Sequence, residues 1–241
     1  MNFSITEAQK KYYQENGFVV QENFLSPEEL VEWRAAIDEA AEARNGRRFS
    51  NKQGYETKDV VSDKQDAPTK AAKDFSAFHQ SVNLWREYPR VRKLILDSRI
   101  GKMASDLEAL DSIRIWHDQS LIKRPWDGFT AYHRDNPYWS FHHPKAISVW
   151  IALDDATYEN GCLYFIPGSH KDVSFRNAGI GKNLGAIFEA LPEFSKVRPV
   201  AAPMKAGSCS FHNGLTIHGA GANMTPFPRR AMTIQFMPPN Q

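Results

Sequence analysis

Several features are scarce in this chain of 241 residues, and each scarcity excludes a class of protein. No apolar run is long enough to span a bilayer as a helix, and the first residues lack the basic and apolar segments of a secretory signal. The formal net charge is only +2, which gives no electrostatic reason to expect binding to nucleic acid or to an anionic membrane. We therefore expect a soluble, cytoplasmic, globular protein.

Cysteine is also rare. The chain contains only Cys162 and Cys209, and both are flanked by apolar, strand-like sequence in which a small buried thiol is the usual case. Two such residues make no disulfide framework, even if they lie near each other in the fold. This composition agrees with a reducing compartment.

Helical patterns dominate the first part of the chain. Thr6 and Gln9 form a capping box for a helix that ends at Gly17, and a short strand is expected at 18–20. Residues 26–29, Ser-Pro-Glu-Glu, are typical of a second helix start, and an apolar stripe at helical spacing follows them. Helical pattern resumes from residue 81 and continues, interrupted by a proline, to residue 110.

After residue 111 the pattern changes to short strands separated by turn residues. Helices followed by many short strands predict an α+β fold with a mainly β core, a sandwich or barrel that carries a helical layer on one side. We expect one domain over 1–241, with helical support and a flap in 1–110. The expected strands are 113–116, 120–123, 146–153, 162–166, 207–212 and 230–236.

Two stretches look like excursions from this core. Residues 45–73 are polar and aperiodic, typical of a long loop or a flap, in which Arg47, Arg48 and Lys52 would meet an acidic group of a substrate. Residues 168–196 carry several glycines and interrupt the strands like a lid over one end of the barrel. A solvated loop and a loosely packed connection explain the two stretches equally well.

The most informative short pattern is His133-Arg134-Asp135. On a strand, residues i and i+2 point to the same face, so the imidazole and the carboxylate would lie together with Arg134 turned away. One more imidazole would complete a two-histidine, one-carboxylate set that leaves positions open on Fe(II). His218, between an apolar run and a glycine-rich turn, is the favoured third ligand. His212 is its rival, or else supports the ligands through a hydrogen bond.

Three segments that occur in the right order resemble the signatures of the phytanoyl-CoA dioxygenase family, whose Fe(II)/2-oxoglutarate oxygenases include ectoine hydroxylase. They are residues 128–135 (GFTAYHRD), 148–170 and 211–230. The resemblance covers residues 110–238 well and extends loosely to the start of the chain. It implies a double-stranded β-helix (jelly-roll, cupin-like) core in 111–241, with the N-terminal helical layer packed on one sheet.

The same resemblance implies roles for individual residues. His133, Asp135 and His218 match the iron ligands, and Arg229 matches the arginine that pairs with the distal carboxylate of 2-oxoglutarate. A guanidinium fork grips a carboxylate bidentately, whereas Arg230 would point to the opposite face of a strand.

Further contacts to 2-oxoglutarate are weaker predictions. Gln119 and Lys123 precede the first iron segment where relatives place polar cosubstrate contacts, although Lys123 would equally well face solvent. Trp150 matches an aromatic position beside the cosubstrate, although such a residue is more often core.

The implied activity is the oxidation, most simply hydroxylation, of an unactivated C–H bond of a small organic metabolite, with Fe(II), 2-oxoglutarate and O2 as cofactor and cosubstrates. Asp135 is retained, which favours hydroxylation over halogenation. The chain is expected to be a monomer or homodimer. Two alternatives remain, a non-catalytic metal- or ligand-binding barrel and a cupin-type metal hydrolase or isomerase. Candidate substrate contacts, each of which would also suit the barrel core, are Trp116, Phe129, Tyr132, Asn136, Trp139 and Arg176.

Overall fold

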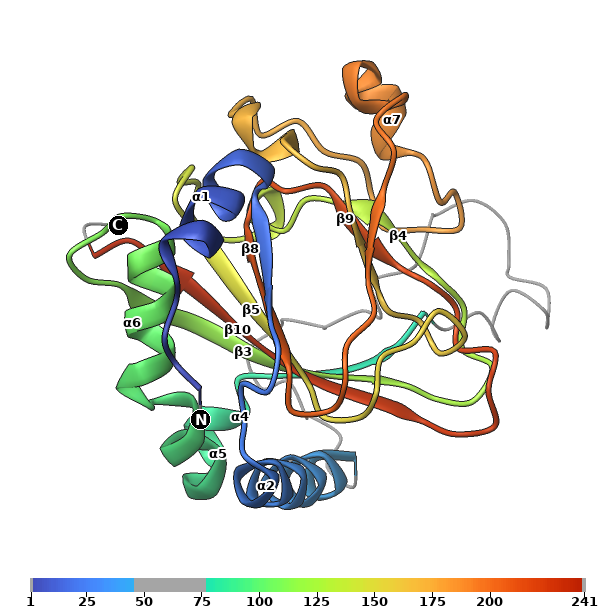
Figure 1. Ribbon diagram of the computed structural model, residues 1–241. Coiled ribbons are helices and arrows are strands. Elements are labelled where there is room, and N and C mark those ends of the chain that lie inside the picture. The colour runs from blue at the N-terminus through green and yellow to red at the C-terminus, as the bar shows by residue number, and fades with distance from the viewer. Residues whose placement is uncertain (1, 46–76, 240–241) are drawn as a thin grey trace.

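Two antiparallel sheets form the core of the computed structural model, which describes residues 2–45 and 77–239 (Figure 1). The strands are β1 (Phe18–Gln21), β2 (His79–Val82), β3 (Arg114–Lys123), β4 (Thr130–His133), β5 (Ile147–Ala152), β6 (Leu163–Phe165), β7 (Val200–Ala202), β8 (Cys209–Asn213), β9 (His218–Ala220) and β10 (Arg229–Met237). The larger sheet has the order β1-β8-β5-β10-β3-β2 and the smaller one β4-β9-β6-β7. This confirms the predicted jelly roll with a mainly β core.

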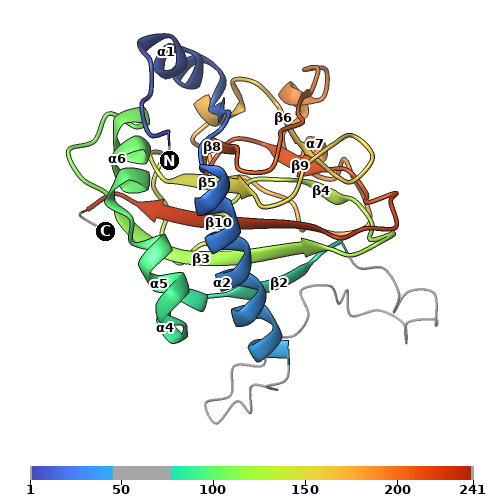
Figure 2. The same ribbon diagram turned by 60° about the horizontal axis from the view of Figure 1, so that its bottom comes forward.

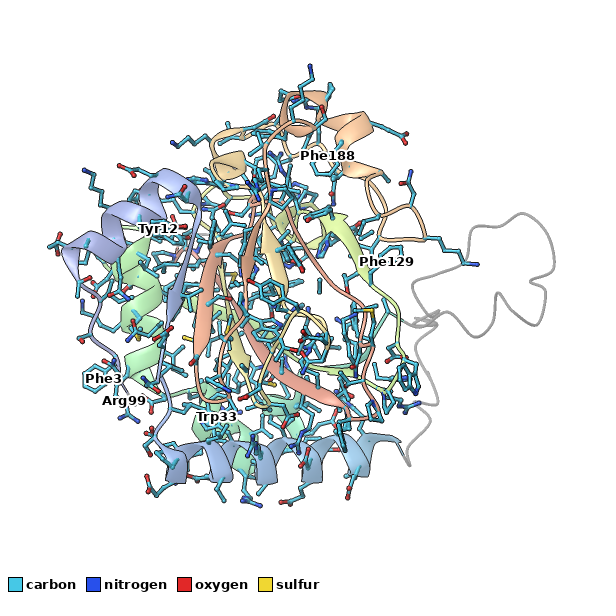
Figure 3. All side chains as sticks on the ribbon, turned by 45° about the vertical axis from the view of Figure 1, so that its right-hand side comes forward. Phe3, Tyr12, Trp33, Arg99, Phe129 and Phe188 are labelled. Carbon is cyan, nitrogen blue, oxygen red and sulfur yellow. The ribbon has the colours of Figure 1, made fainter. Side chains whose placement is uncertain are left out.

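Helices cover the outer face of the larger sheet, as expected (Figure 2). These are α1 (Glu7–Asn16), α2 (Pro27–Asn45), α4 (Leu84–Glu87), α5 (Pro89–Ile95) and α6 (Ser98–Leu107). Both predicted caps are present, since Thr6 and Gln9 form the capping box of α1 and Ser26 accepts a hydrogen bond from the backbone N–H of Glu29. Trp33, labelled on α2 in Figure 3, is buried in the apolar layer beneath these helices.

The predicted helix beginning near Ser81 is wrong at its start. Ser81 and Val82 belong to β2, where Ser81 pairs with Ser120 of β3, and α4 begins only after Asn83 at φ 57°. The carboxylate of Asp118 accepts the backbone N–H groups of Leu84 and Trp85. Strand pairing therefore outweighs the local helical pattern. The two strands predicted at 113–116 and 120–123 are also one continuous strand, β3.

Alternation along the strands divides the larger sheet into two unlike faces. Met232 and Ile234 of β10 pack outward under the helices, while Ala231 packs inward against the smaller sheet. The two buried, free thiols follow this division, because Cys209 joins the outer core and Cys162 the inner one. The inner face is the one that positions the site.

The segment 168–196 contains η2 (Ser169–Lys171), α7 (Ile187–Ala190) and η3 (Pro192–Phe194). Its apolar residues pack with Ile166 and Ile217, and the backbone carbonyl of Leu184 accepts the N–H of Tyr132 on β4. The segment thus covers the edge of the smaller sheet, and its role as a lid stays a prediction. The expected flap, with Arg47, Arg48 and Lys52, lies outside the described residues. Across those described ranges, no helix has the length and apolar character needed to cross a membrane.

Candidate metal centre

Three side chains from two distant segments of the sequence converge where the ends of β4 and β9 meet. His133 ends β4, His218 begins β9, and the two are paired across the strands. Asp135 follows β4 directly, and one ligand atom from each of the three lies within 4.8 Å of the others. The Asp135 Oδ1 atom is 3.5 Å from Nε2 of His133 and 3.7 Å from Nε2 of His218. The structure brings together the three residues predicted as ligands.

The route by which Asp135 reaches this centre differs from the prediction. Its backbone is helical (φ −74°, ψ −49°), and it caps the 3-10 turn η1 (Asn136–Tyr138) instead of continuing the strand. The N–H of Asn136 is held by the carbonyl of Gly214, so the chain bends at this point. Arg134 is turned away as expected, buried with its guanidinium donating to the Ser169 carbonyl at 2.8 Å.

Hydrogen bonds fix both imidazoles with one nitrogen facing the centre. Nδ1 of His133 lies 2.8 Å from the Ala131 carbonyl, and Nδ1 of His218 lies 3.0 Å from the Thr216 carbonyl. A carbonyl only accepts, so each Nδ1 carries the proton and each Nε2 presents its lone pair toward Asp135. Two such imidazoles and one carboxylate are the donor set that suits Fe(II) with open coordination positions.

The protonation states also suit metal binding. Burial raises the pKa of Asp135, but its electrostatic interactions with the imidazoles of His218, His133 and His212 outweigh burial and hold that pKa well below its usual range. Burial, with the neighbouring His133, lowers the pKa of His218 to about 3. An ionised carboxylate and a neutral imidazole are the forms that ligate.

The second carboxylate oxygen of Asp135 is held by the larger sheet. Ser148 Oγ donates to Oδ2 at 3.0 Å, and Nε2 of His212 lies 3.3 Å from the same atom. His212 therefore supports the ligand Asp135, which agrees with the supporting role considered for it and not with its role as a rival ligand. Such partners orient a ligand toward its metal.

Arg229 provides a buried positive charge on the inner face of β10. Its side chain is 3% exposed, its Cζ lies 5.1 Å from the centre of the Trp150 ring, and Nη2 donates to the Gly161 carbonyl at 3.4 Å. Nε and Nη1 have no hydrogen-bond partner within residues 2–45 and 77–239. Burial lowers the pKa of Arg229 to about 10, so the group stays charged at neutral pH. A buried guanidinium with free donors fits an incoming carboxylate.

Lys123 is buried beside Arg229, which excludes the solvent-facing alternative. Its Nζ donates to the carbonyls of Gly128 at 2.6 Å and Ala77 at 2.5 Å, and burial together with the charge of Arg229 lowers its pKa to about 7. Gln119 faces the interior and hydrogen-bonds His117. Cosubstrate contacts by Gln119, Lys123 and Trp150 stay predictions.

The aromatic candidates for the substrate pocket do not lie together in one group. Trp116 and Trp139 lie together, with ring centres 5.6 Å apart, and Phe129 lies half-buried just before β4 (Figure 3). Tyr132 instead packs against Phe188, 5.5 Å between ring centres, in the apolar cluster under 168–196. Because β4 directs His133 inward, its neighbour Tyr132 points outward, and a role for Tyr132 in the pocket stays a prediction.

The two polar candidates are engaged elsewhere. Asn136 is buried and its amide donates to the His143 carbonyl at 2.7 Å. Arg176 is half exposed and ion-paired with Asp172 at 2.8 Å and Glu193 at 2.5 Å. Substrate roles for these two stay predictions.

Sequence reasoning missed the polar residues that line the inner face beside the centre. Ser148 and Gln235 sit among apolar neighbours on β5 and β10. The sequence did contain a signal for them, which is a polar residue at an inward position of an otherwise apolar strand. Such a residue needs a hydrogen-bond partner inside the protein and therefore indicates a nearby polar site.

Comparison with known proteins shows which family this chain resembles. The sequence model of the phytanoyl-CoA dioxygenase family matches residues 13–231. Phytanoyl-CoA dioxygenase 1 of Oryza sativa subsp. japonica is 28% identical over 255 residues, which cover 96% of this chain and 88% of the relative.

Solved structures of the same fold agree. The α-ketoglutarate-dependent carbocyclase SnoK from nogalamycin biosynthesis is 26% identical with a TM-score of 0.77, over 98% of this chain and 85% of that one. The epimerase SnoN, solved with Fe3+, α-ketoglutarate and nogalamycin RO, is 24% identical with a TM-score of 0.74, over 96% and 83%.

Proposed function

The chain belongs to the phytanoyl-CoA dioxygenase family, and we propose that it hydroxylates, or otherwise oxidises, an unactivated C–H bond of a small organic metabolite. It is an Fe(II)- and 2-oxoglutarate-dependent oxygenase that uses O2. One observation carries the proposal. The two histidines of the His133–Asp135–His218 set are buried, with both Nε2 lone pairs directed inward, and Arg229 has donors on the same inner surface that no described residue occupies.

Each residue has a defined task in this reaction. His133, Asp135 and His218 would hold the iron on one side and leave the opposite side open. Fe(II) bound there supplies the dioxygen chemistry that couples decarboxylation of 2-oxoglutarate, to succinate and CO2, with oxidation of a C–H bond. Arg229 binds the distal carboxylate and so sets the orientation of 2-oxoglutarate, with Trp150 beneath the guanidinium.

The surrounding barrel keeps the chemistry away from bulk water. The inner face beside the site is closed by Phe18 and Phe165, whose rings stack with centres 4.4 Å apart, and the Phe165 ring lies 6.1 Å from that of His218. Exclusion of water suppresses side reactions of an activated oxidant. The retained carboxylate of Asp135 occupies the position that a halide would need, which supports hydroxylation over halogenation.

Oxygen uptake by the purified protein tests this proposal. With Fe(II) and 2-oxoglutarate, a panel of small metabolites is expected to contain members that stimulate both oxygen uptake and succinate release. His133→Ala should abolish both. His142→Ala, which removes an exposed imidazole, should abolish neither.

Two other outcomes would overturn the proposal. Ligand binding that survives His133→Ala, without turnover of any panel member, would favour a non-catalytic barrel. Turnover that requires zinc or manganese and consumes no oxygen would favour a hydrolase or isomerase.

A further inference from the structure

A row of four polar side chains crosses the inner face of the larger sheet at the level of the metal centre. Ser148 of β5 pairs with His212 of β8 on one side and with Gln235 of β10 on the other. Gln235 in turn pairs with His117 of β3. Residues directly opposite each other on neighbouring strands present their side chains together, about 5 Å apart at Cβ.

The two halves of this row have different partners. His212 and Ser148 both contact Oδ2 of Asp135, so they serve the metal centre. Gln235 and His117 continue the row sideways, one and two strands beyond Ser148. Neither is required to hold iron or the distal carboxylate of 2-oxoglutarate, so their polarity needs another explanation.

Gln235 carries an unsatisfied hydrogen-bond acceptor. The residue is 3% exposed, its Nε2 donates to Thr233 Oγ1 at 2.8 Å, and its Oε1 has no hydrogen-bond partner among the described residues. Leaving a buried amide oxygen unpaired is unfavourable. A donor from a bound molecule would remove that cost.

His117 adds a second neutral polar group with an aromatic surface next to it. The Gln119 amide lies 2.7 Å from its Nε2 and orients the ring. The register of β10 and β3 shifts beside Gln235, so that Phe236 pairs with Ile115 and Trp116 is the extra residue of a β-bulge. A bulge redirects a side chain, and the Trp116 ring lies 3.8 Å from that of His117 between ring centres.

We infer that Gln235 and His117 form a substrate subsite for an uncharged hydrogen-bonding group, a hydroxyl or carboxamide, carried on an apolar body that lies against Trp116 and Trp139. This inference rests on the proposed oxygenase function. It places the polar group of the substrate beside the metal centre and its hydrocarbon part toward the aromatic cluster, which also contains Phe141.

The charges around the row exclude an ionic substrate group at this position. Neither glutamine ionises, and burial lowers the pKa of His117 to about 4, although the nearby carboxylate of Asp135, which would be bound to the iron, opposes this shift. The inward cations Arg229 and Lys123 lie six residues along their strands from Gln235 and His117 respectively. A carboxylate or ammonium held against neutral groups would lose hydration without a compensating countercharge.

Binding of a matched set of small molecules tests the inference without requiring turnover. The anaerobic Fe(II)·2-oxoglutarate complex has a visible charge-transfer band that responds when a molecule binds beside the metal. The probes are cyclohexanol, cyclohexanecarboxamide, cyclohexanecarboxylate and cyclohexylamine. We expect the alcohol and the carboxamide to bind at least about tenfold more tightly than the two ions, the effect of one well-placed hydrogen bond.

Two variants test whether the preference for uncharged probes comes from the row of polar side chains. Gln235→Leu removes the free acceptor and should reduce the preference to less than about threefold, with the affinity for 2-oxoglutarate unchanged. Gln21→Leu is the control, because Gln21 is a similarly buried strand glutamine on β1 whose amide oxygen already pairs with Gln9. It should keep the full preference.

Each other result overturns a defined claim. Tighter binding of the carboxylate or the amine, or an unchanged preference in Gln235→Leu, would overturn the subsite. A band that forms with 2-oxoglutarate but responds to none of the four probes would also overturn it. If no band forms at all, it is the oxygenase function that fails.

Discussion

The two faces of the six-stranded sheet place neighbouring residues of the same strands in opposite surroundings. Arg229 points inward, is buried, and has two guanidinium nitrogens that no residue in the described part of the chain pairs. Arg230 points outward, where Asp154 and Asp38 pair with it at 2.8 and 2.5 Å. Hydrogen bonding to Asp154 raises the pKa of Arg230 above its ordinary value, whereas burial lowers that of Arg229.

The same contrast recurs on β8. Phe211 is fully buried in the outer core, while the adjacent His212 faces inward and supports Asp135. The outer face is mainly apolar, although, within the described residues, Ser120, Trp85 and Tyr88 each leave one polar atom unpaired in its layer. On the inner face, charged and polar groups of Arg229, Gln235 and His212 keep atoms that no described residue pairs. We interpret the outer face as the source of stability and the inner face as the source of chemistry, at a cost in stability that ligands recover.

The largest expected effect comes from the outer face. Phe211→Ala removes a fully buried ring and should lower the free energy of unfolding by about 3–5 kcal/mol, because the cavity it leaves is only partly refilled. Chemical denaturation measures this loss. The folded variant should bind Fe(II) with unchanged affinity. If it bound Fe(II) as weakly as the His212→Ala variant, the claim that the outer face contributes to stability and not to metal binding would be wrong.

The two arginines form a matched pair. Arg229→Gln should raise KM for 2-oxoglutarate about 100-fold, roughly 2.7 kcal/mol, because a charged bidentate contact is lost, with little loss of stability. Arg230→Gln should leave that KM unchanged and lower the free energy of unfolding by about 1 kcal/mol, since the ion pairs it breaks are partly exposed. Steady-state kinetics and denaturation of both variants separate the two roles. If Arg230→Gln raised the KM and Arg229→Gln did not, the conclusion that Arg229 faces the site and Arg230 faces away from it would be refuted.

A smaller change is expected from the support of Asp135. His212→Ala should weaken Fe(II) binding by about 10–100-fold, the usual range for a partner that orients a metal ligand. Competition with a chelator of known affinity measures it. His212→Gln, whose amide is able to reach the same carboxylate oxygen, should recover part of the loss. If both variants bind iron like the unchanged protein, the contact has no orienting role.

The smallest effect concerns a carboxylate buried among the outer helices. Burial raises the pKa of Glu108 to about 7, although Tyr13 and Asn213 hydrogen-bond it and Lys145 lies nearby. Because the folded state binds its proton more tightly than the unfolded state, its contribution to stability is present below pH 4.5 and is lost as the pH rises toward 7. The slope is at most about 1.4 kcal/mol per pH unit.

Glu108→Gln isolates this contribution. The variant's free energy of unfolding, relative to that of the unchanged protein, should rise between pH 5 and pH 7 and then level off. Denaturation curves at several pH values measure the difference. A difference that does not vary with pH would show that Glu108 keeps its ordinary pKa in the folded protein.

Sequence patterns predicted much of the site because they encode which way a side chain faces. The family resemblance indicated Arg229, alternation placed Arg230 on the opposite face, and the structure agrees that the two residues face opposite ways. Caps predicted α1 and α2 because their hydrogen bonds are made within one helical turn. The grouping of His133 with His218 depended on matching family signatures, because no local pattern relates residues so far apart.

What the sequence did not predict depends on contacts between distant segments. Asp135 leaves its strand because Gly214 holds the following residue, and Ser81 joins a sheet edge that exists only once β3 is in place. Lys123 is buried because the turns before β2 and β4 supply carbonyls to its ammonium. The row from His212 to His117 requires the register of four strands, which is a property of the assembled sheet.

The most direct test of the central claim is a crystal structure of the protein grown without oxygen in the presence of Fe(II) and 2-oxoglutarate. We predict one iron bound by Nε2 of His133, Nε2 of His218 and Oδ1 of Asp135. We also predict that the distal carboxylate of 2-oxoglutarate pairs with the guanidinium of Arg229. Iron held by other residues, or a distal carboxylate far from Arg229, would contradict these predictions.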